Sequence, residues 1–402
     1  MNKVKKCRIC YKEKFFEIVN FDKVYLSGNI NIKKRIEKKY KLNLILCKNC
    51  KHVQIGYLVN PDLLFKNYLW ETGVSKTNIS LINDLLLKLN KKNYLEKKKI
   101  FEIACNDGSL LRIAKKKYKC LVSGIDPAKN LVKKNNKINI INNYFNFVVA
   151  KKIKQEFKSF DIVIARNVLA HVKDPNEIFL GAKYLLNEKG IFIIEVPSLK
   201  TIYLENQYDN IFHEHIGFHS LKSIINLCKN NDMKIIDVEE INSQGKSLRC
   251  YISHKTNPIK ERKKINHLLK KENFLLKKST WINFKEKIYN HKNNLNSLIL
   301  KFKKKGKKVA GYGASGKGQS LIQISKIGKY IDPIFDKSKL KQSKFTPGFN
   351  IQIQNPKMIN KIKPDVLLLL TWNIKDEILK QEITFRKRGG KFIIPFPKPH
   401  VI

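Results

Sequence analysis

One stretch constrains the fold of this chain more than any other. It reads Ile-Phe-Glu-Ile-Ala-Cys-Asn-Asp-Gly-Ser-Leu-Leu over residues 100–111, and Gly-Ile-Asp-Pro follows at 124–127. The pattern predicts a buried strand, a tight loop, a helix and a second strand that ends in an acid. Such a unit is half of an open α/β sheet that binds a nucleotide at the carboxyl ends of its strands. The plainer alternative is an ordinary βαβ unit with a polar turn.

The side chains of this loop favour one kind of ligand. The loop carries a single glycine, Gly108, so it is not shaped for the pyrophosphate of a dinucleotide. Glu102, Asn106 and Asp107 suit a ligand with a positively charged amino acid end. Asp126, at the end of the second strand, is placed to accept hydrogen bonds from ribose hydroxyls. S-adenosylmethionine (SAM) has both features, and we therefore expect a SAM site here.

Two Cys-x-x-Cys pairs near the N-terminus predict a metal site. Cys7 and Cys10 form the first pair, and Cys47 and Cys50 form the second. Four thiolates complete a tetrahedral zinc site and leave no position open for water, so we expect a structural zinc ion. The start of the chain has no apolar signal region and no apolar run approaches membrane length, which predicts a cytoplasmic protein. In that compartment paired cysteines indicate metal rather than disulfides.

The composition leaves the partner open. At 402 residues, two or three domains are expected. The net charge is +48, but the lysines are spread along the chain, whereas a nucleic-acid binder usually gathers its charge in a patch. Lysine as the default surface residue is the plain interpretation. The charge would still favour any anionic substrate.

A polar loop further along the chain concentrates histidines. His213, Glu214 and His215 are consecutive, and His219 follows. Their spacing is not the i, i+4 spacing of the helical metal motif. A histidine beside a carboxylate on a loop makes a general base that changes charge near neutral pH. The structural alternative is a polar turn with packed imidazoles.

A second glycine-rich loop lies in the C-terminal part. Residues 311–318 read Gly-Tyr-Gly-Ala-Ser-Gly-Lys-Gly after a predicted strand, and Asp336 lies 20 residues beyond Gly316. Formally this is the dinucleotide fingerprint, which predicts NAD. The backbone N–H groups of such a loop would cradle a phosphate, and Lys317 would add charge.

Taken together, these motifs resemble the nucleotide-sugar C-methyltransferase family over essentially the whole chain. The resemblance is carried by the cysteine pairs, Glu102 to Gly108, Asp126-Pro127, Asn167 to Val172, His213 to His215, Gly311 to Gly318, Thr371-Trp372-Asn373 and the final Pro-Phe-Pro. It implies a SAM-dependent enzyme that methylates carbon in a keto-deoxysugar carried on a nucleoside diphosphate. Deprotonation beside the ketone would precede methyl transfer.

The resemblance also implies an α/β architecture in three domains. We expect a small zinc-binding module at 1–70, a class I (Rossmann-like) SAM methyltransferase domain at 71–255, a helical linker at 256–304 and a Rossmann-like substrate-side domain at 305–402. The expected partner is a nucleotide-diphosphate sugar, without nucleic acid or membrane, and the expected state is a monomer or weak homo-oligomer.

Site roles follow from the same resemblance. His215 matches the base, polarised by Glu214, and His171 and Tyr68 match groups near the substrate that would stabilise the enolate oxygen. Residues on the SAM-binding motifs are Glu102, Asn106, Asp107, Gly108, Asp126 and Asn167. The C-terminal loop is placed on the substrate side rather than with NAD, which assigns Gly313, Ser315, Lys317 and Asn373 to substrate binding.

The sequence departs from the family pattern at Phe212, where a tyrosine is usual, and at Lys246 and Gly217-Phe218. These changes bear on the substrate more than on the reaction.

Three alternatives remain: a zinc-ribbon RNA methyltransferase, favoured by the charge, a non-catalytic zinc and nucleotide-binding module, and an NAD oxidoreductase using the C-terminal loop.

Overall fold

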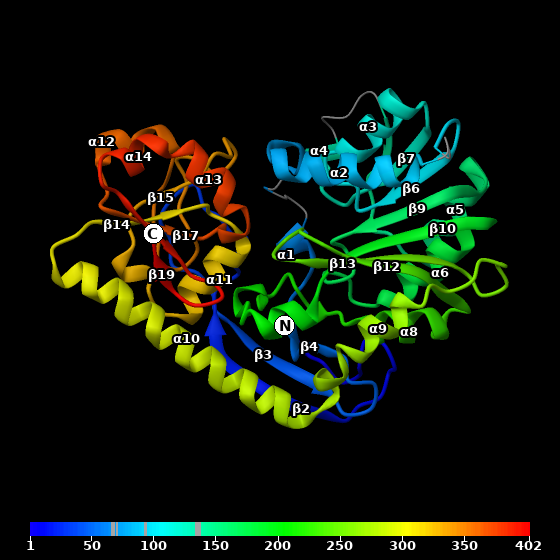
Figure 1. The fold of residues 1–402 in the computed structure, drawn as a ribbon, viewed down its shortest axis with the longest axis horizontal. Coiled ribbons are helices and arrows are strands. Elements are labelled where there is room, and N and C mark those ends of the chain that lie inside the picture. The colour runs from blue at the N-terminus through cyan, green and yellow to red at the C-terminus, as the bar shows by residue number, and fades with distance from the viewer. Residues whose placement is uncertain (66–68, 70, 92–94, 133–137) are drawn as a thin grey trace.

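The protein consists of two α/β sheets joined by an N-terminal module (Figure 1). In this computed structural model, the described residues are 1–65, 69, 71–91, 95–132 and 138–402. The sheet of the central domain and the sheet of the C-terminal domain lie at opposite ends of the view, and the N-terminal strands lie beneath and between them. The predicted fold class is confirmed.

The central sheet contains seven strands among the described residues, in the order β8-β7-β6-β9-β10-β13-β12. All neighbours are parallel except β13, which is antiparallel to both β10 and β12. This order places the carboxyl ends of β6, β7 and β9 together, where a nucleotide ligand binds in such folds. The elements are η1 (Thr72–Val74), α2 (Lys76–Leu89), β6 (Lys99–Ile103), α3 (Ser109–Tyr118), β7 (Leu121–Ile125), α4 (Lys129–Val132), β8 (Asn139–Ile141), α5 (Phe147–Phe157), β9 (Phe160–Arg166), α6 (Pro175–Leu185), β10 (Leu186–Pro197), α7 (Leu199–Leu204), η2 (Tyr208–Asn210), α8 (Leu221–Asn230), β12 (Met233–Ile241) and β13 (Ser247–His254).

Local sequence explains where the helices of this domain begin. Ser75, Asn146, Asp174 and Ser220 precede α2, α5, α6 and α8, and each side chain accepts a hydrogen bond from a backbone N–H of the first turn. Pro175 fits the first position of α6 because that position needs no N–H donor. The strands β6 and β9 and the second half of β10 are mostly apolar and buried, as expected for strands covered on both faces.

The N-terminal module contains an antiparallel sheet in the order β11-β4-β3-β2. Its edge strand β11 (Gly217–Phe218) comes from far along the chain, directly after the His213–His215 loop. The histidine loop is therefore joined to the N-terminal module by strand pairing. The other elements are β1 (Asn2–Lys3), β2 (Phe15–Val24), β3 (Tyr40–Cys47), β4 (Val53–Ile55), β5 (Tyr57–Leu58) and α1 (Asp62–Phe65).

The C-terminal domain has a sheet in the order β16-β15-β14-β17-β18-β19, parallel apart from β19. Its first helix, α11, is capped by Ser315, whose Oγ accepts a hydrogen bond from Gly318 N at 3.0 Å. The elements are β14 (Val309–Tyr312), α11 (Gly316–Ile324), η4 (Gly328–Tyr330), β15 (Ile334–Phe335), β16 (Ile353–Gln354), η5 (Pro356–Met358), α12 (Ile359–Ile362), β17 (Val366–Leu369), η6 (Trp372–Ile374), α13 (Lys375–Gln381), α14 (Ile383–Lys387), β18 (Lys391–Ile394) and β19 (His400–Val401).

A long helix, α10 (Lys278–Lys304), spans the underside of the molecule, preceded by α9 (Lys264–Lys270) and η3 (Asn273–Leu276) (Figure 1). Its buried side includes Trp281, Phe284 and Ile288, which share one hydrophobic core with the N-terminal strands and the C-terminal sheet. This continuous core fixes the N-terminal module against the C-terminal domain. Within the described part of the chain, none of the helices combines the length and the apolar character needed to cross a membrane.

Candidate active site

The four cysteines of the two Cys-x-x-Cys pairs come together. The Sγ atoms of Cys7, Cys10, Cys47 and Cys50 all lie within 4.8 Å of one another, with 3.5 Å between Cys7 and Cys50 and 3.6 Å between Cys10 and Cys47. Four sulfurs bonded to one zinc ion at about 2.3 Å lie about 3.8 Å apart, so the cluster fits a tetrahedral zinc ion. Four thiolates fill a tetrahedral zinc shell, which agrees with a structural role.

The residue between the first two cysteines reaches out of the cluster. Arg8 is only 5% exposed, and its guanidinium donates to the carbonyl oxygens of Leu169 (3.4 Å), Val172 and Lys173 (3.2 Å). These carbonyls surround His171 in the chain. The first cysteine pair therefore braces the loop that carries one of the predicted active-site histidines.

The two histidine loops are joined by their backbones. The carbonyl oxygen of Ala170 accepts hydrogen bonds from Ile216 N at 2.7 Å and Gly217 N at 3.1 Å. On the other side, Ile55 N donates to the Ile216 carbonyl at 3.2 Å. As a result, the rings of His171 and His215 lie 4.9 Å apart, edge to face.

Each of these rings has a defined tautomer when it is neutral. Nδ1 of His171 lies 2.9 Å from the Glu214 carbonyl oxygen, and Nδ1 of His215 lies 3.0 Å from the Asn210 carbonyl oxygen. A carbonyl oxygen only accepts, so Nδ1 carries the proton in both rings and Nε2 carries the lone pair. Burial lowers the pKa of His171 to about 4, and burial, together with electrostatic interactions with His171 and Lys317 that disfavour a second positive charge, lowers the pKa of His215 well below its ordinary value. Both rings are neutral at pH 7 and can accept a proton.

Glu214 differs from the expectation that it polarises His215. Its backbone carbonyl receives the His171 Nδ1 proton, whereas its carboxylate packs against Gly28 of the N-terminal module. Burial raises the pKa of this carboxyl to about 7, and Lys341 opposes the rise. The Asn210 carbonyl, not the Glu214 carboxylate, orients the imidazole of His215. His213 faces the Lys41 carbonyl and has a structural place in the N-terminal module.

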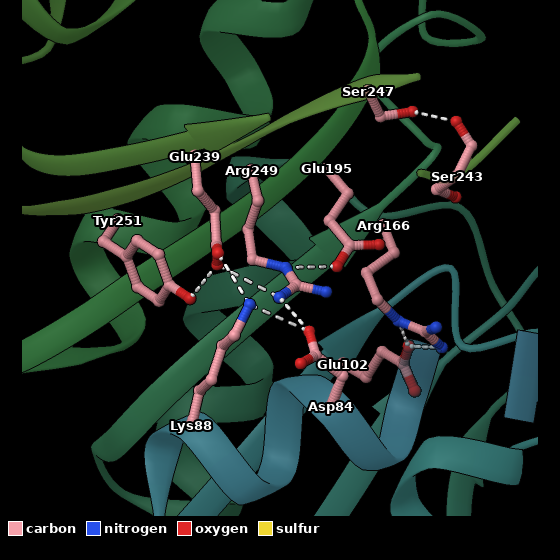
Figure 2. Close-up of polar contacts among 10 residues, drawn as sticks. All are labelled: Asp84, Lys88, Glu102, Arg166, Glu195, Glu239, Ser243, Ser247, Arg249 and Tyr251. Atoms are coloured by element: carbon pink, nitrogen blue, oxygen red, sulfur yellow. Dashed lines mark hydrogen bonds and ion pairs between the residues drawn. The ribbon is translucent and has the colours of Figure 1, made fainter. Parts of the chain in front are cut away.

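Charged side chains gather at the carboxyl ends of the central strands (Figure 2). Glu102 is buried and accepts two hydrogen bonds from Arg166 on one oxygen, at 3.0 and 2.7 Å. Beside them, Glu195 pairs with the fully buried Arg249 at 2.7 Å (Figure 2). The remaining oxygen of Glu102 has no hydrogen-bond partner among the described residues, and burial raises the pKa of this carboxyl to about 7 although Arg166 opposes the rise.

The loop after β6 organises its own polar residues. Asp126 accepts hydrogen bonds from Asn106 N at 2.7 Å and Ala128 N at 2.8 Å. The Asp107 carboxylate accepts a hydrogen bond from Gly73 N at 2.8 Å, which joins this loop to the η1 turn. Gly108 has φ 71°, a left-handed conformation suited to glycine, and directly precedes α3.

In the C-terminal loop, the phosphate-cradling positions of a dinucleotide fold are occupied by the protein itself. Ala314 N donates to Asp336 Oδ2 at 2.7 Å, and Gly313 N donates to the Phe335 carbonyl at 2.7 Å. A Cβ built on Gly316 would lie only 3.0 Å from the ring of Phe212. This crowding leaves little room for a pyrophosphate and argues against the NAD alternative.

One cavity of about 1740 Å³ is lined by all three parts of the protein. Pockets for a single small ligand usually have 300–1,000 Å³, so this cavity has room for two ligands. The predicted site residues that line it are His171, Glu214, His215, Asn106, Asp126, Asn167, Ser315, Lys317 and Asn373. Glu102, Asp107, Gly108 and Gly313 instead support the surrounding loops, and Tyr68 lies outside the described residues.

Comparison with known proteins accounts for the same three parts. Families described as a zinc binding domain, a methyltransferase domain and a C-methyltransferase C-terminal domain match residues 7–65, 74–238 and 242–397. The C-methyltransferase NovU of Streptomyces niveus is 28% identical over 408 residues, which is 99% of this chain and 97% of that protein. The chain belongs to the C-methyltransferases. This C-methyltransferase uses SAM, and its four-cysteine cluster is the predicted zinc site.

Two further similarities are to other methyltransferases. A ubiquinone biosynthesis O-methyltransferase of Glaesserella parasuis serovar 5 (strain SH0165) is 31% identical to this C-methyltransferase over 137 residues, 31% of this chain and 57% of that protein. The structure of magnesium protoporphyrin IX methyltransferase from Synechocystis PCC 6803 with bound SAM is 14% identical, covering 44% of this chain and 79% of that one with a TM-score of 0.33.

The residues of the C-methyltransferase fit SAM at the carboxyl ends of β6, β7 and β9. Asn167 lines the cavity, and its Oδ1 is a buried acceptor without a hydrogen-bond partner among the described residues, the kind of group that an ammonium can satisfy. The sequence interpretation missed Arg166, which lines the cavity over Glu102, and Arg8. A signal existed for Arg166, because arginine is rarely buried without a partner and this one directly follows the apolar run of β9.

Proposed function

We propose that this C-methyltransferase acts on a keto-deoxysugar carried by a nucleoside diphosphate, and that His215 removes the proton next to the ketone. The main support is the pair of neutral imidazoles on the cavity wall. Each has its Nδ1 proton held by a backbone carbonyl, so each Nε2 is free to accept a proton. A carbon acid needs such a base, because its proton is weakly acidic.

The two ends of the cavity suit the two reactants. Asn106, Asp126 and Asn167 line the end formed by the central sheet, and Ser315 and Asn373 line the end formed by the C-terminal domain. SAM, when bound, supplies an electrophilic methyl group. The protein contributes alignment of the carbon acid and a base.

Phe212 contributes shape rather than hydrogen bonding. Its ring lies 4.3 Å from that of His215 and is buried. It fixes the imidazole plane from one side while the Asn210 carbonyl fixes it through Nδ1. The hydroxyl of the usual family tyrosine is missing from this position, so the enolate oxygen must be stabilised by another group.

The remaining expectations belong to this proposal. We expect a monomer or weak homo-oligomer. Work in the cytoplasm, without nucleic acid, agrees with cysteines that form no disulfide and with lysines spread along the sequence. The net charge of +48 favours an anionic substrate such as a nucleoside diphosphate.

A ligand panel tests the proposal. S-adenosylhomocysteine, dTDP, CDP, GDP, NADH and a short RNA are compared by thermal shift and calorimetry, since ligands of the native state raise its melting temperature. We expect S-adenosylhomocysteine and one nucleoside diphosphate to bind. His215→Ala should abolish methylation of the matching keto-sugar nucleotide and leave S-adenosylhomocysteine binding intact. Salt-sensitive RNA binding without any nucleotide binding would instead support the RNA methyltransferase.

A further inference from the structure

Enolate formation needs a positive charge or a hydrogen-bond donor at the ketone oxygen. Neither cavity histidine supplies one in its neutral state. The Nδ1 protons of His171 and His215 are directed to backbone carbonyls, and both Nε2 atoms carry lone pairs. Phe212, whose ring is tilted by 39° against that of His215, has no hydroxyl. The histidines therefore provide bases, and the acid has to come from elsewhere in the cavity.

Lys317 is a buried cation on the wall of this cavity. The residue is 8% exposed, and its Nζ donates to the Gln244 carbonyl oxygen at 2.7 Å, which occupies one of three N–H donors. Its charge acts on the His215 imidazole. Burial lowers the pKa of Lys317 to about 8 and the nearby Asp209 carboxylate opposes that change, so the ammonium is mostly charged at pH 7.

The groups that hold Lys317 are themselves held firmly. Gln244, Gly245 and Lys246 have φ values of 53°, 86° and 76°, three successive left-handed residues of which two are not glycine. Gln207 Nε2 donates to the Gly245 carbonyl at 2.8 Å and fixes this turn. Non-glycine residues in this conformation concentrate at functional sites, where surrounding contacts enforce them.

Phosphate binding is a poor explanation for Lys317. The adjacent Ala314 N–H is used by the Asp336 carboxylate, and Phe212 covers Gly316. A diphosphate here would meet the negative charge of Asp336 and few free N–H groups. Lys341, the other buried lysine of this region, is directed to that same Asp336 at 3.5 Å and to the Ala314 carbonyl at 2.9 Å.

We propose that Lys317 is the electrophilic partner of His215 and that its ammonium contacts the ketone oxygen of the substrate. This role rests on the proposed function. In the step, the C–H bond next to the ketone breaks and His215 Nε2 takes the proton. The electron pair of that bond forms the carbon–carbon double bond, and the carbonyl π pair moves to oxygen, where Lys317 stabilises the negative charge. The enolate carbon then bonds to the methyl group while the S–CH3 pair returns to sulfur and the ketone re-forms.

The test separates enolate formation from methyl transfer. The holoenzyme is mixed with S-adenosylhomocysteine and a dTDP-4-keto-2,6-dideoxyhexose in D2O, and replacement of the proton next to the ketone by deuterium is followed by NMR. We expect Lys317→Met to slow exchange at least about 100-fold, the usual effect of losing one oxyanion donor, while the affinities for S-adenosylhomocysteine and dTDP change less than about twofold. Lys287→Met is the matched control, because this half-buried lysine also donates to a carbonyl (Tyr203, 2.9 Å) but lies outside the cavity lining.

Each outcome decides something. Exchange in Lys317→Met within threefold of wild type overturns the role of Lys317 alone, as does a loss confined to dTDP affinity, which would make it a phosphate anchor. Absence of exchange in the wild type with this substrate and its CDP and GDP counterparts overturns the proposed function and the role of Lys317 with it. If Lys317→Met fails to bind S-adenosylhomocysteine, Lys317→Arg replaces it: the proposal expects about tenfold slower exchange with unchanged dTDP affinity, and wild-type exchange overturns it.

Discussion

Replacing Arg8 should separate the stability of the protein from its activity. In the folded protein the guanidinium makes hydrogen bonds to three carbonyls around His171. Hydrogen bonds from a charged donor contribute about 1.5–3 kcal/mol each, so Arg8→Met removes about 5 kcal/mol or more of favourable interaction. The same change also removes a buried charge, and that effect has the opposite sign.

The cost of that buried charge follows from its pKa. Burial lowers the pKa of Arg8 from 12.5 to about 9. One pKa unit corresponds to about 1.4 kcal/mol, so keeping the charge costs about 5 kcal/mol. The two effects nearly cancel, and we expect the free energy of unfolding of Arg8→Met to lie within about 2 kcal/mol of wild type.

Activity has no such compensation. Without its brace the 169–173 loop can shift, and a displacement of about 1 Å near the reacting atoms costs on the order of 100-fold in rate. We expect kcat/KM for the keto-sugar nucleotide to fall about 100-fold, with zinc content and S-adenosylhomocysteine affinity unchanged. Arg35→Met, which removes a half-exposed arginine of the same module, is the control and should match wild type.

Two results would refute this reasoning. If Arg8→Met keeps kcat/KM within threefold of wild type while zinc remains bound, the loop does not need the brace. If the variant loses more than about 4 kcal/mol of stability in urea unfolding, the hydrogen bonds outweigh the cost of the buried charge.

Three further predictions follow from other contacts. Burial raises the pKa of Glu272 to about 7, so the folded state binds a proton more tightly than the unfolded state and stability falls as pH rises from about 4.5 to 7. Glu272→Gln, which keeps an acceptor for Leu221 N, should be more stable than wild type by up to about 3 kcal/mol at pH 8 and equal to it at pH 4. Identical pH profiles of the two proteins in urea unfolding would contradict this. Gly316→Ala puts a Cβ about 3.0 Å from the Phe212 ring and should lower kcat about tenfold, because it presses that ring on His215. The affinity for S-adenosylhomocysteine, measured by calorimetry, should be unchanged, and an unaltered kcat would show that the Phe212 ring moves freely. Cys47→Ser or removal of zinc with a chelator should abolish methylation but preserve S-adenosylhomocysteine binding, because the cluster supports the histidine loops rather than the ends of β6 and β7. If chelation abolished both methylation and S-adenosylhomocysteine binding, the metal would be required for the fold of the whole protein.

The sequence identified those parts of the site that depend on short-range spacing. The Cys-x-x-Cys pairs, the strand–loop–helix around Gly108 and the histidine cluster are each complete within a few residues, so their geometry is largely local. Tyr11 and Lys51, each four residues after the first cysteine of a pair, both adopt left-handed φ values (57° and 61°), which shows how similar the two turns are.

Contacts between distant segments could not be predicted in this way. Adjacency in sequence did not show the orientation of Glu214, because the folded chain turns its carboxylate toward Gly28 and gives Nδ1 of His215 the Asn210 carbonyl as its partner. Similarly, Glu102 is buried under Arg166, 64 residues away, and does not line the cavity itself. Hydrophobic periodicity shows which face of an element is buried but not which side chain of another element meets it.

The pairing of β11 with β4 has a consequence for recombination between related enzymes. The sheet of the N-terminal module includes a strand, β11, that lies some 150 residues after α1 in the sequence and follows the histidine loop. If only the first 70 residues were exchanged for those of a relative, β11 would pair with a strand of different sequence in place of β4, and His171 and His215 would be displaced. Substrate preference should therefore be inherited as two separate sequence blocks, the cysteine module and residues 210–220, which have to be transplanted as a pair.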